Sequence, residues 1–373
     1  MPTPFVFRSQ TMSIEVRPLN VKCNIACEYC YQNNLREAKN LSTTYNLEAM
    51  KATLQAVGHP FAVFGGEPLL LGKPALEELF RLGYQQYGRN VIQTNGTLID
   101  DDHIRLFRQY NVHIGISLDG PGELNIARWA GSLERTRTLT AKTEQAIARL
   151  LDENLSLGLI ITLHRGNAAP DKLPTLIAWI RTLSAQGVGR IRLHLLEADS
   201  SHIRQKFGLT TAENLHALTQ FEALEAELGQ KFFDIFDDMK RMLGFQDYKA
   251  SCVWRGCDSY NTEAVQSVNH LGLLTNCGRT TQDGVDFLKA DDHGYERYLA
   301  LYHTPHEHGG CQDCRFFLAC KGYCPGTAIH NDWRNRTEYC DLLTQLFERV
   351  EAEMVAKGQI PLSLHPERVQ RVG

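Results

Sequence analysis

Three closely spaced cysteines constrain this chain more than any other feature of its sequence. Cys23, Cys27 and Cys30 have three residues between the first pair and two between the second. A four-iron cluster normally takes four protein thiolates. Three thiolates at this spacing would bind three irons and leave the fourth open to a molecule that is not protein. The alternatives are a zinc site, which generally needs four ligands in two close pairs, or unrelated buried thiols.

This spacing, with Tyr29 before the last cysteine, resembles the radical S-adenosylmethionine (SAM) superfamily. The resemblance implies that SAM chelates the open iron through its amino and carboxylate groups. An electron from the cluster then splits SAM into methionine and a 5′-deoxyadenosyl radical. Tyr29 is a candidate to stack or pack on the adenine of SAM, with a place in the core as the equal alternative.

Composition limits the class of protein and its partners. The chain has 373 residues, enough for two domains, with 43% hydrophobic residues and a formal net charge of −4. That charge argues against nucleic acid or an anionic membrane surface as the main partner. The sequence has no apolar run of bilayer-spanning length and no secretory signal. We therefore expect a cytoplasmic protein without nucleic-acid or membrane partners.

The eleven cysteines form two groups. Three lie at 23–30, eight lie between Cys252 and Cys340, and none lies in the 221 residues between the groups. Inside a cell such a set is not a disulfide framework. Because three plus four plus four equals eleven, the count predicts one open four-iron cluster and two closed ones.

The N-terminal half alternates short apolar strands with amphipathic helices. We expect strands at 14–18, 60–64, 90–94, 112–118, 157–163 and 189–196, with helices at 46–58, 74–87, 101–110, 140–154 and 170–186. Six such units predict a parallel α/β domain, and they are too few for an eightfold barrel. The family resemblance implies that this domain is a partial (β/α)6 TIM-like barrel. The active groups of such a barrel lie beyond the C-terminal ends of its strands.

Two motifs follow the second and third strands. Gly65, Gly66 and Glu67 match the GGEP motif of the superfamily, which implies contact with the amino group of SAM. A glycine pair lets backbone approach a ligand closely, although it could also be a simple turn. Thr94 and Asn95 belong to a Gln-Thr-Asn-Gly stretch that lines the pocket in proteins resembling this one.

Further polar residues follow the later strands. Ser117 and Asp119 are candidate partners for a ribose hydroxyl or the substrate, with a capped turn as the alternative. Arg165 is expected to pair with the SAM carboxylate through its planar fork, unless it is a surface residue. A general base is not identified by any motif, and the candidates are Asp119, His194 and Glu197.

Strand signals end near residue 200, and helical spacing replaces them. We therefore expect a radical SAM partial barrel at 1–200, a helical connector at 201–249, a small Cys-rich domain at 250–345 and a C-terminal helix and tail at 346–373. The Cys-rich part resembles the seven-cysteine SPASM domain, because the cysteines of 311–324 have gaps of two, five and three residues.

The SPASM resemblance implies two auxiliary four-iron clusters. The first would be held by Cys252, Cys257, Cys277 and Cys324, and the second by Cys311, Cys314, Cys320 and Cys340. A pair of zinc ribbons is the alternative, but it requires two Cys-x2-Cys knuckles. This part of the sequence has one such pair.

Radical SAM proteins with two auxiliary clusters commonly modify peptides or proteins. We therefore expect an oxidoreductase or lyase that matures a ribosomally made precursor peptide, by C–H abstraction followed by crosslinking or by backbone rearrangement and excision. Its partners would be the peptide or protein substrate, a separate small peptide-recognition protein, and a flavodoxin- or ferredoxin-type reductant.

Two other functions compete with this one. An anaerobic sulfatase-type maturase forming formylglycine has an acidic residue directly after an auxiliary-cluster cysteine, and the residue after Cys277 is Gly278. A non-catalytic electron carrier with three clusters is the second. Such a carrier has no use for Gly65, Gly66 and Glu67 or for an open cluster.

Overall fold

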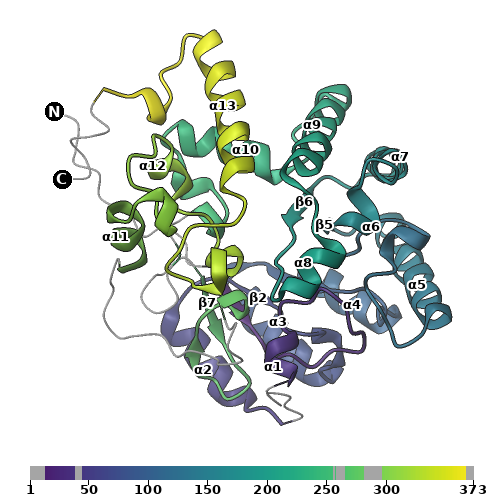
Figure 1. The fold of residues 1–373 in the computed structure, drawn as a ribbon. Helices are drawn as coiled ribbons and strands as arrows, with labels where there is room; N and C mark the ends of the chain where they lie inside the picture. The colour runs from purple at the N-terminus through teal and green to yellow at the C-terminus, as the bar shows by residue number, and fades with distance from the viewer. Residues whose placement is uncertain (1–12, 38–43, 255–256, 258–264, 281–295, 367–373) are drawn as a thin grey trace. The chain divides into compact units, whose positions relative to one another are not determined.

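The computed structural model describes residues 13–37, 44–254, 257, 265–280 and 296–366, and these residues form a mixed α/β structure (Figure 1). Their strands make one sheet in the order β6-β5-β4-β3-β2-β1-β7-β8. The strands are β1 (Ser13–Val16), β2 (Phe61–Val63), β3 (Asn90–Thr94), β4 (Val112–Ser117), β5 (Leu157–Leu163), β6 (Ile191–Leu195), β7 (Val265–Val268) and β8 (Leu274–Thr275). Strands β1 to β6 pair in parallel. The expected α/β class and its six parallel strands are therefore confirmed.

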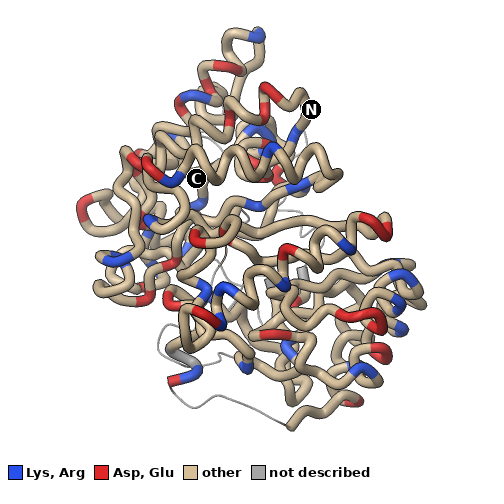
Figure 2. Tube along the Cα trace, turned by 90° about the vertical axis from the view of Figure 1, so that its right-hand side faces the viewer, with Lys and Arg blue, Asp and Glu red and all other residues tan. Residues whose placement is uncertain are grey.

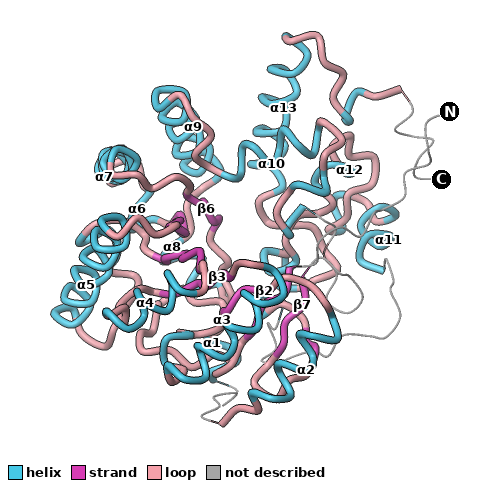
Figure 3. Tube along the Cα trace, turned by 180° about the vertical axis from the view of Figure 1, so that it is seen from behind, coloured by secondary structure: helices cyan, strands magenta, loops and turns pink. Residues whose placement is uncertain are grey.

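Helices separate the parallel strands along the chain, as a βαβ pattern requires. The helices are α1 (Asn33–Glu37), α2 (Leu47–Val57), α3 (Lys73–Tyr87), α4 (Asp101–Gln109), α5 (Leu133–Asp152), α6 (Arg165–Ala168), α7 (Leu173–Ala185), α8 (Ser201–Phe207), α9 (Thr211–Leu228), α10 (Asp234–Leu243), α11 (Glu296–His303), α12 (Phe317–Cys320) and α13 (Cys340–Ala356). Figure 3 shows them in cyan.

One row of apolar side chains fixes the register of the parallel strands. Val16 on β1 is level with Val63 on β2, which is level with Ile92 on β3, and the row continues through Ile114 and Leu157. All five side chains are buried. A slip of one residue would turn a strand's buried side chains to the opposite face, so burial of this row specifies the pairing.

The helix expected at 140–154 begins earlier, at Leu133, after an N-cap at Ser132. The first turns carry threonines rather than apolar residues, so their periodicity is weak. Thr136, Thr140 and Thr143 are nevertheless buried, and each hydroxyl donates to the carbonyl four residues before it. Because the hydroxyls are satisfied within the helix, threonine fills buried positions that a count of apolar residues misses.

Strands β7 and β8 add an antiparallel hairpin beyond β1 that the sequence analysis did not predict. The amide of Arg17 donates to the carbonyl of Val268 at 2.8 Å, and its buried guanidinium donates to the hydroxyl of Thr275 at 2.7 Å. The β1 edge of the parallel sheet is therefore covered by chain that is distant in sequence.

The described residues form two compact units. The first contains 13–234 and 266–280, and the second contains 235–254, 257, 265 and 296–366. The segment 201–249, expected to be a helical connector, contains α8, α9 and α10 and divides between the units. Helix α9 packs on α7 within the first unit, where Arg181 pairs with Glu227 at 2.7 Å (Figures 1 and 3), whereas α10 belongs to the second. The last helix, α13, begins at Cys340 rather than at 346.

The second unit has an aromatic core. The ring of Trp254, which is 1% exposed, packs edge-on against Tyr323 and Phe347, with centroids 4.9 and 5.6 Å away. Phe316 stacks on Phe347 at 5.4 Å. Trp254 follows α10, Phe316 and Tyr323 flank α12, and Phe347 lies in α13, so the rings join these segments. Phe316 and Phe347 also line the cavity that holds four cysteines of this unit.

Charge is spread over the described chain, with basic and acidic residues interspersed along the trace (Figure 2). None of the helices in the described ranges is both long enough and apolar enough to cross a membrane. The charge pattern agrees with the mild net charge of the sequence.

Candidate functional site

The loop after β1 lies directly against the glycine pair that follows β2. The amide of Gly66 donates to the carbonyl of Asn20 at 2.9 Å. The amide of Glu67 donates to the carbonyl of Lys22 at 2.8 Å. A Cβ on Gly66 would lie 2.1 Å from the Lys22 oxygen, and Gly65 has a φ of +127°. Because only glycine permits both features, the pair positions the start of the cysteine loop.

The carboxylate of Glu67 braces the end of β3. It is buried, and one oxygen accepts from the hydroxyl of Thr94 at 2.6 Å and from the amide of Leu69 at 3.0 Å. The other oxygen accepts from the amide of Asn95 at 2.8 Å. Burial raises the pKa of Glu67, and these three donors oppose the rise. The Glu67 side chain thus orients the Thr94–Asn95 turn. Because both of its oxygens already accept hydrogen bonds, the backbone of Gly65 and Gly66 is the part of the motif that is suited to a ligand.

Asn95 connects this turn to the first cysteine. Its amide nitrogen donates to the side-chain oxygen of Asn24 at 2.8 Å and lies 3.8 Å from the sulfur of Cys23. Asn24 in turn donates to the hydroxyl of Thr97 at 2.8 Å. A donor directed at a ligand sulfur stabilises its negative charge and tunes a cluster.

Two arginines face the sulfurs of the loop. A terminal nitrogen of Arg128 lies 3.8 Å from the sulfur of Cys27. Burial raises the pKa of Cys27 to about 12, although Arg128 opposes this. Burial lowers the pKa of Arg36, but the charges of Cys30 and Cys23 outweigh it and raise that pKa. Partly exposed thiols with a raised pKa ionise when a metal displaces the proton, so the donor set fits an iron cluster.

A small cavity lies beside the loop. It is lined by residues from the loop, from the ends of β3 and β4 and from α5, among them Ile25, Asn95, Ser117, Arg128 and Thr140. The hydroxyl of Ser117 accepts from the side chain of Gln93 at 2.8 Å. Hydroxyl, amide and guanidinium groups at one wall suit a ligand that carries both amino and carboxylate groups.

Asp119, just past β4, is the centre of a buried polar network. One oxygen accepts from the hydroxyl of Tyr29 and lies 3.2 Å from Nε of Arg128. The same oxygen lies 3.4 Å from Nε2 of His164, and the other accepts from the amide of Thr162 at 3.1 Å. Burial alone would raise the pKa of Asp119, but Arg128, followed by His164 and Tyr29, holds it at about 2.

This network gives Tyr29 and Asp119 positioning roles. The ring of Tyr29 is buried with Phe207, at 6.0 Å, and tilts against His164 at 5.1 Å. Tyr29 is therefore part of a buried cluster, and its contact with the adenine stays a prediction. A carboxylate with a pKa of about 2 is a weak proton acceptor at neutral pH, which argues against Asp119 as the general base.

The structure favours the surface alternative for Arg165. Its side chain is 45% exposed and pairs with Glu213 of α9 at 3.1 Å. Its other terminal nitrogen donates to the carbonyl of Gly208 at 2.8 Å. Arg165 thus links the start of α6 to α9 at the surface. Arg128, whose side chain is 11% exposed, lies beside the cysteine loop. The motif analysis missed it because it lies in the stretch between β4 and α5.

His194 and Glu197, at the end of β6, are brought together by Arg279. The guanidinium of Arg279 donates to Glu197 at 2.7 Å and to Nδ1 of His194 at 2.9 Å, and it lies 5.5 Å from the ring centroid of Tyr31. Within the described ranges the second oxygen of Glu197 is buried and has no hydrogen-bond partner. Burial raises the pKa of Glu197, with Arg279 opposing, and lowers that of His194. Arg279 was not anticipated, although it stands two residues after Cys277.

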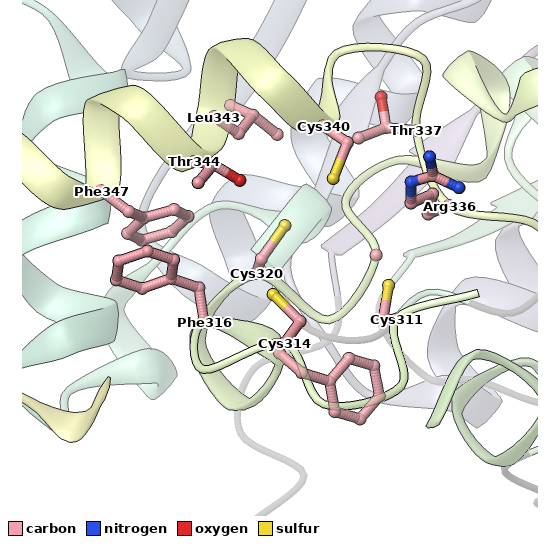
Figure 4. Close-up of a pocket in the computed structure, with 12 residues that line it drawn as sticks. Cys311, Cys314, Phe316, Cys320, Arg336, Thr337, Cys340, Leu343, Thr344 and Phe347 are labelled. Carbon is pink, nitrogen blue, oxygen red and sulfur yellow. The ribbon is translucent and has the colours of Figure 1, made fainter. Parts of the chain in front are cut away.

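Four cysteines of the second unit line one cavity (Figure 4). They are Cys311, Cys314, Cys320 and Cys340, and their thiols turn toward the same space. Burial raises the pKa of Cys311 to about 12. Cys252, Cys257 and Cys324 belong to the same unit, whereas Cys277 belongs to the first. No group of three or more His, Cys, Asp or Glu side chains among the described residues is arranged around a single-ion position.

Gly66→Ala should disrupt the contact between the two loops. The added methyl would meet the Lys22 carbonyl, so we expect the free energy of unfolding to fall by roughly 1–3 kcal/mol. We also expect the reconstituted protein to contain about four fewer irons per chain. Urea unfolding and iron analysis measure both. Gly189→Ala is the control, because its Cβ would meet no atom within 4 Å. Equal behaviour of the two variants would contradict the assigned role.

Asp119→Asn should remove a stabilising charge. The folded pKa lies below the ordinary value of 3.8, so the charge contributes about 2 kcal/mol above about pH 5, and this contribution is lost as the pH falls toward 2. Urea unfolding of iron-free protein at pH 7 and pH 3 should show a difference from wild type that shrinks at pH 3. Asp171→Asn, at a side chain 70% exposed, should change neither value. A difference independent of pH would assign the loss to packing instead.

Comparison with known proteins agrees with this geometry. The model of the radical SAM superfamily matches residues 18–171. A cysteine-type anaerobic sulfatase-maturating enzyme of Clostridium perfringens is 33% identical over 128 residues, which are 31% of this chain and 34% of that protein. The match thus spans about a third of that relative's length. A serine-type anaerobic sulfatase-maturating enzyme of Bacteroides thetaiotaomicron is 24% identical over 85% of this chain and 83% of that protein.

Solved structures share the fold over most of the chain. The structure of anSMEcpe with bound AdoMet and Cp18Cys peptide has a TM-score of 0.70 and 19% identity, covering 92% of this chain and 98% of that one. Streptococcus suis SuiB bound to S-adenosylmethionine has a TM-score of 0.62 and 13% identity, covering 89% and 77%. At these identities the likeness concerns the fold. The family match covers the cysteine loop and the glycine motif, and it identifies residues 18–171 as a radical SAM domain.

Proposed function

We propose that the chain is a radical SAM maturase that abstracts a hydrogen atom from a ribosomally made peptide. The observation that carries the proposal is the cysteine loop, whose three thiols meet Arg36, Arg128 and the side chain of Asn95. The superfamily implies SAM and a four-iron cluster. When bound, they supply the 5′-deoxyadenosyl radical, and Cys23, Cys27 and Cys30 would hold the cluster.

The protein's own residues would position SAM and exclude water. The cavity beside the loop offers Arg128 to a carboxylate and Ser117 to a polar group, and Asn95 stands at its edge. The ion pair with Asp119 fixes the orientation of Arg128, so little side-chain freedom remains to be lost on binding. The backbone of Gly65 and Gly66 would contact the amino group of the ligand.

Two auxiliary clusters belong to the proposal. The cavity of Cys311, Cys314, Cys320 and Cys340 supports the second predicted set, because four thiols converge there beside buried aromatic rings. The set of Cys252, Cys257, Cys277 and Cys324 stays a prediction, since its members come from both units. A flavodoxin- or ferredoxin-type protein would supply electrons.

Glu197 is the proposed proton acceptor among the three candidates. Asp119 is held ionised by Arg128 and is a weak base, while Nδ1 of His194 faces the guanidinium of Arg279. Glu197 keeps one buried oxygen without a hydrogen-bond partner in the described part of the chain. Burial raises its pKa toward the range useful for proton transfer at neutral pH.

The peptide substrate is supported by what similar proteins bind. SuiB has been solved bound to the precursor peptide SuiA, and anSMEcpe has been solved with the Cp18Cys peptide. A sulfatase-type maturase is the second candidate, favoured by the sulfatase-maturating relatives. Gly278 argues against it, because that place after Cys277 offers no carboxylate.

The reaction with SAM tests the enzyme against the electron carrier. The anaerobically reconstituted, reduced protein should release 5′-deoxyadenosine from SAM, measured by chromatography. Replacing Cys23, Cys27 and Cys30 together by alanine should abolish release and leave about eight irons per chain, at four per closed cluster. Wild-type protein with intact clusters and no product would favour the carrier, and twelve irons in the variant would refute the ligand assignment.

The substrate class can be tested with two peptides. Co-expression with a small peptide encoded beside the gene should give a product lighter by two hydrogen atoms if a crosslink forms, or by a larger fragment after excision, as measured by mass spectrometry. A peptide carrying a sulfatase active-site Cys or Ser is the comparison, with a hydrazine probe for formylglycine. An aldehyde on the second peptide and an unchanged first peptide would favour the sulfatase-type function.

A further inference from the structure

A buried arginine lies among the cysteines of the second unit. Arg297, in α11, is 1% exposed. A guanidinium has five N–H donors, and here each of them reaches a backbone carbonyl. The acceptors are those of Trp333, Cys257, Tyr323, Gly322 and Asn335.

These carbonyls belong to the segments that carry the cysteines. Cys257 itself accepts at 3.1 Å, and Tyr323, which precedes Cys324, accepts at 3.0 Å. Gly322 lies in the same short loop, with a φ of +76°, and a Cβ there would lie 3.4 Å from the guanidinium. The loop from Cys320 to Cys324 would provide one ligand to each auxiliary cluster, so Arg297 orients the backbone that both clusters share.

The charge of Arg297 is placed among potential thiolates. Burial lowers the pKa of Arg297, while Cys257 and Cys324, followed by Cys311 and Cys320, raise it. Arginine remains protonated in proteins, and a buried charge is costly unless opposite charge surrounds it. Cysteines from both predicted sets therefore act on the same cation.

We propose that Arg297 is the shared counter-charge of the two auxiliary clusters, a positioning residue that raises the reduction potential of both. The inference rests on the proposed function, because it requires that both clusters are present. A four-iron cluster ligated by thiolates is anionic, and its potential depends on net charge, burial and hydrogen bonds to sulfur. A fixed cation stabilises the reduced form, which carries one more negative charge. Its removal should make both clusters harder to reduce.

Redox titration of full-length protein tests this inference. In a background with Cys23, Cys27 and Cys30 replaced by alanine, the two auxiliary clusters are followed by electron paramagnetic resonance. Arg297→Gln should lower the reduction potential of each cluster by about 59 mV, which is a tenfold change in the equilibrium constant for one-electron reduction. Arg297→Lys, which keeps the charge, should stay close to the parent. Arg334→Gln is the control, because that exposed side chain pairs with Asp332, and it should shift neither potential.

Each result decides the question. Loss of clusters in the Gln variant with retention in the Lys variant would also support the inference, because charge would then be required for assembly. Unchanged potentials in a cluster-loaded Gln variant would overturn the inference. Equal shifts or equal cluster loss in the Gln and Lys variants would also overturn it, because they would show that the hydrogen bonds of the planar guanidinium matter and its charge does not. A parent holding fewer than about eight irons would instead refute the proposed clusters, and the inference with them.

Discussion

The structure of the site depends on one close contact between two backbones. Gly66 approaches Lys22 so closely that a side chain would not fit, and two amide–carbonyl hydrogen bonds join the segments. The contact places the cysteine loop at the C-terminal edge of β1 and β2, where parallel sheets gather their functional groups. Glu67 then connects the loop to β3, because its carboxylate accepts hydrogen bonds from Thr94 and Asn95. The pairing of β1, β2 and β3 therefore determines where the cysteine loop lies.

Buried charge is the second organising principle. Arg128 compensates Asp119, Arg279 compensates Glu197, and Arg297 lies among cysteine residues. Each arginine comes from a segment outside the parallel strands and reaches groups that burial would otherwise neutralise. The ionisation of these acids and thiols therefore depends on arginines from other segments, nine residues away for Asp119 and 82 for Glu197. Replacing one of these arginines should change the ionisation of its partner.

Periodicity was sufficient for the parallel sheet, since buried strands read as short apolar runs and their helices have one apolar face. It was insufficient for the start of α5, where buried threonines donate their hydroxyls to carbonyls of the same helix. It was also insufficient for the β7–β8 hairpin, which lies beside β1 although it is far from β1 in sequence. The cysteine and glycine motifs located the loop because their spacing is local. Arg128 and Arg279 were missed, and the choice between the two alternatives for Arg165 stayed open, because no local pattern states which arginine will be largely buried.

The β7–β8 hairpin has a consequence for how the chain can be divided. It covers the edge of β1 and contributes Val268 and Thr275 to the environment of Arg17, although the polypeptide reaches it only after passing through the second unit. A fragment ending near residue 234 would leave the donors and acceptors of that edge open to other molecules, which is the usual starting point of strand-mediated aggregation. The first unit and the cysteine-rich region are therefore expected to require expression as one chain rather than as separate modules.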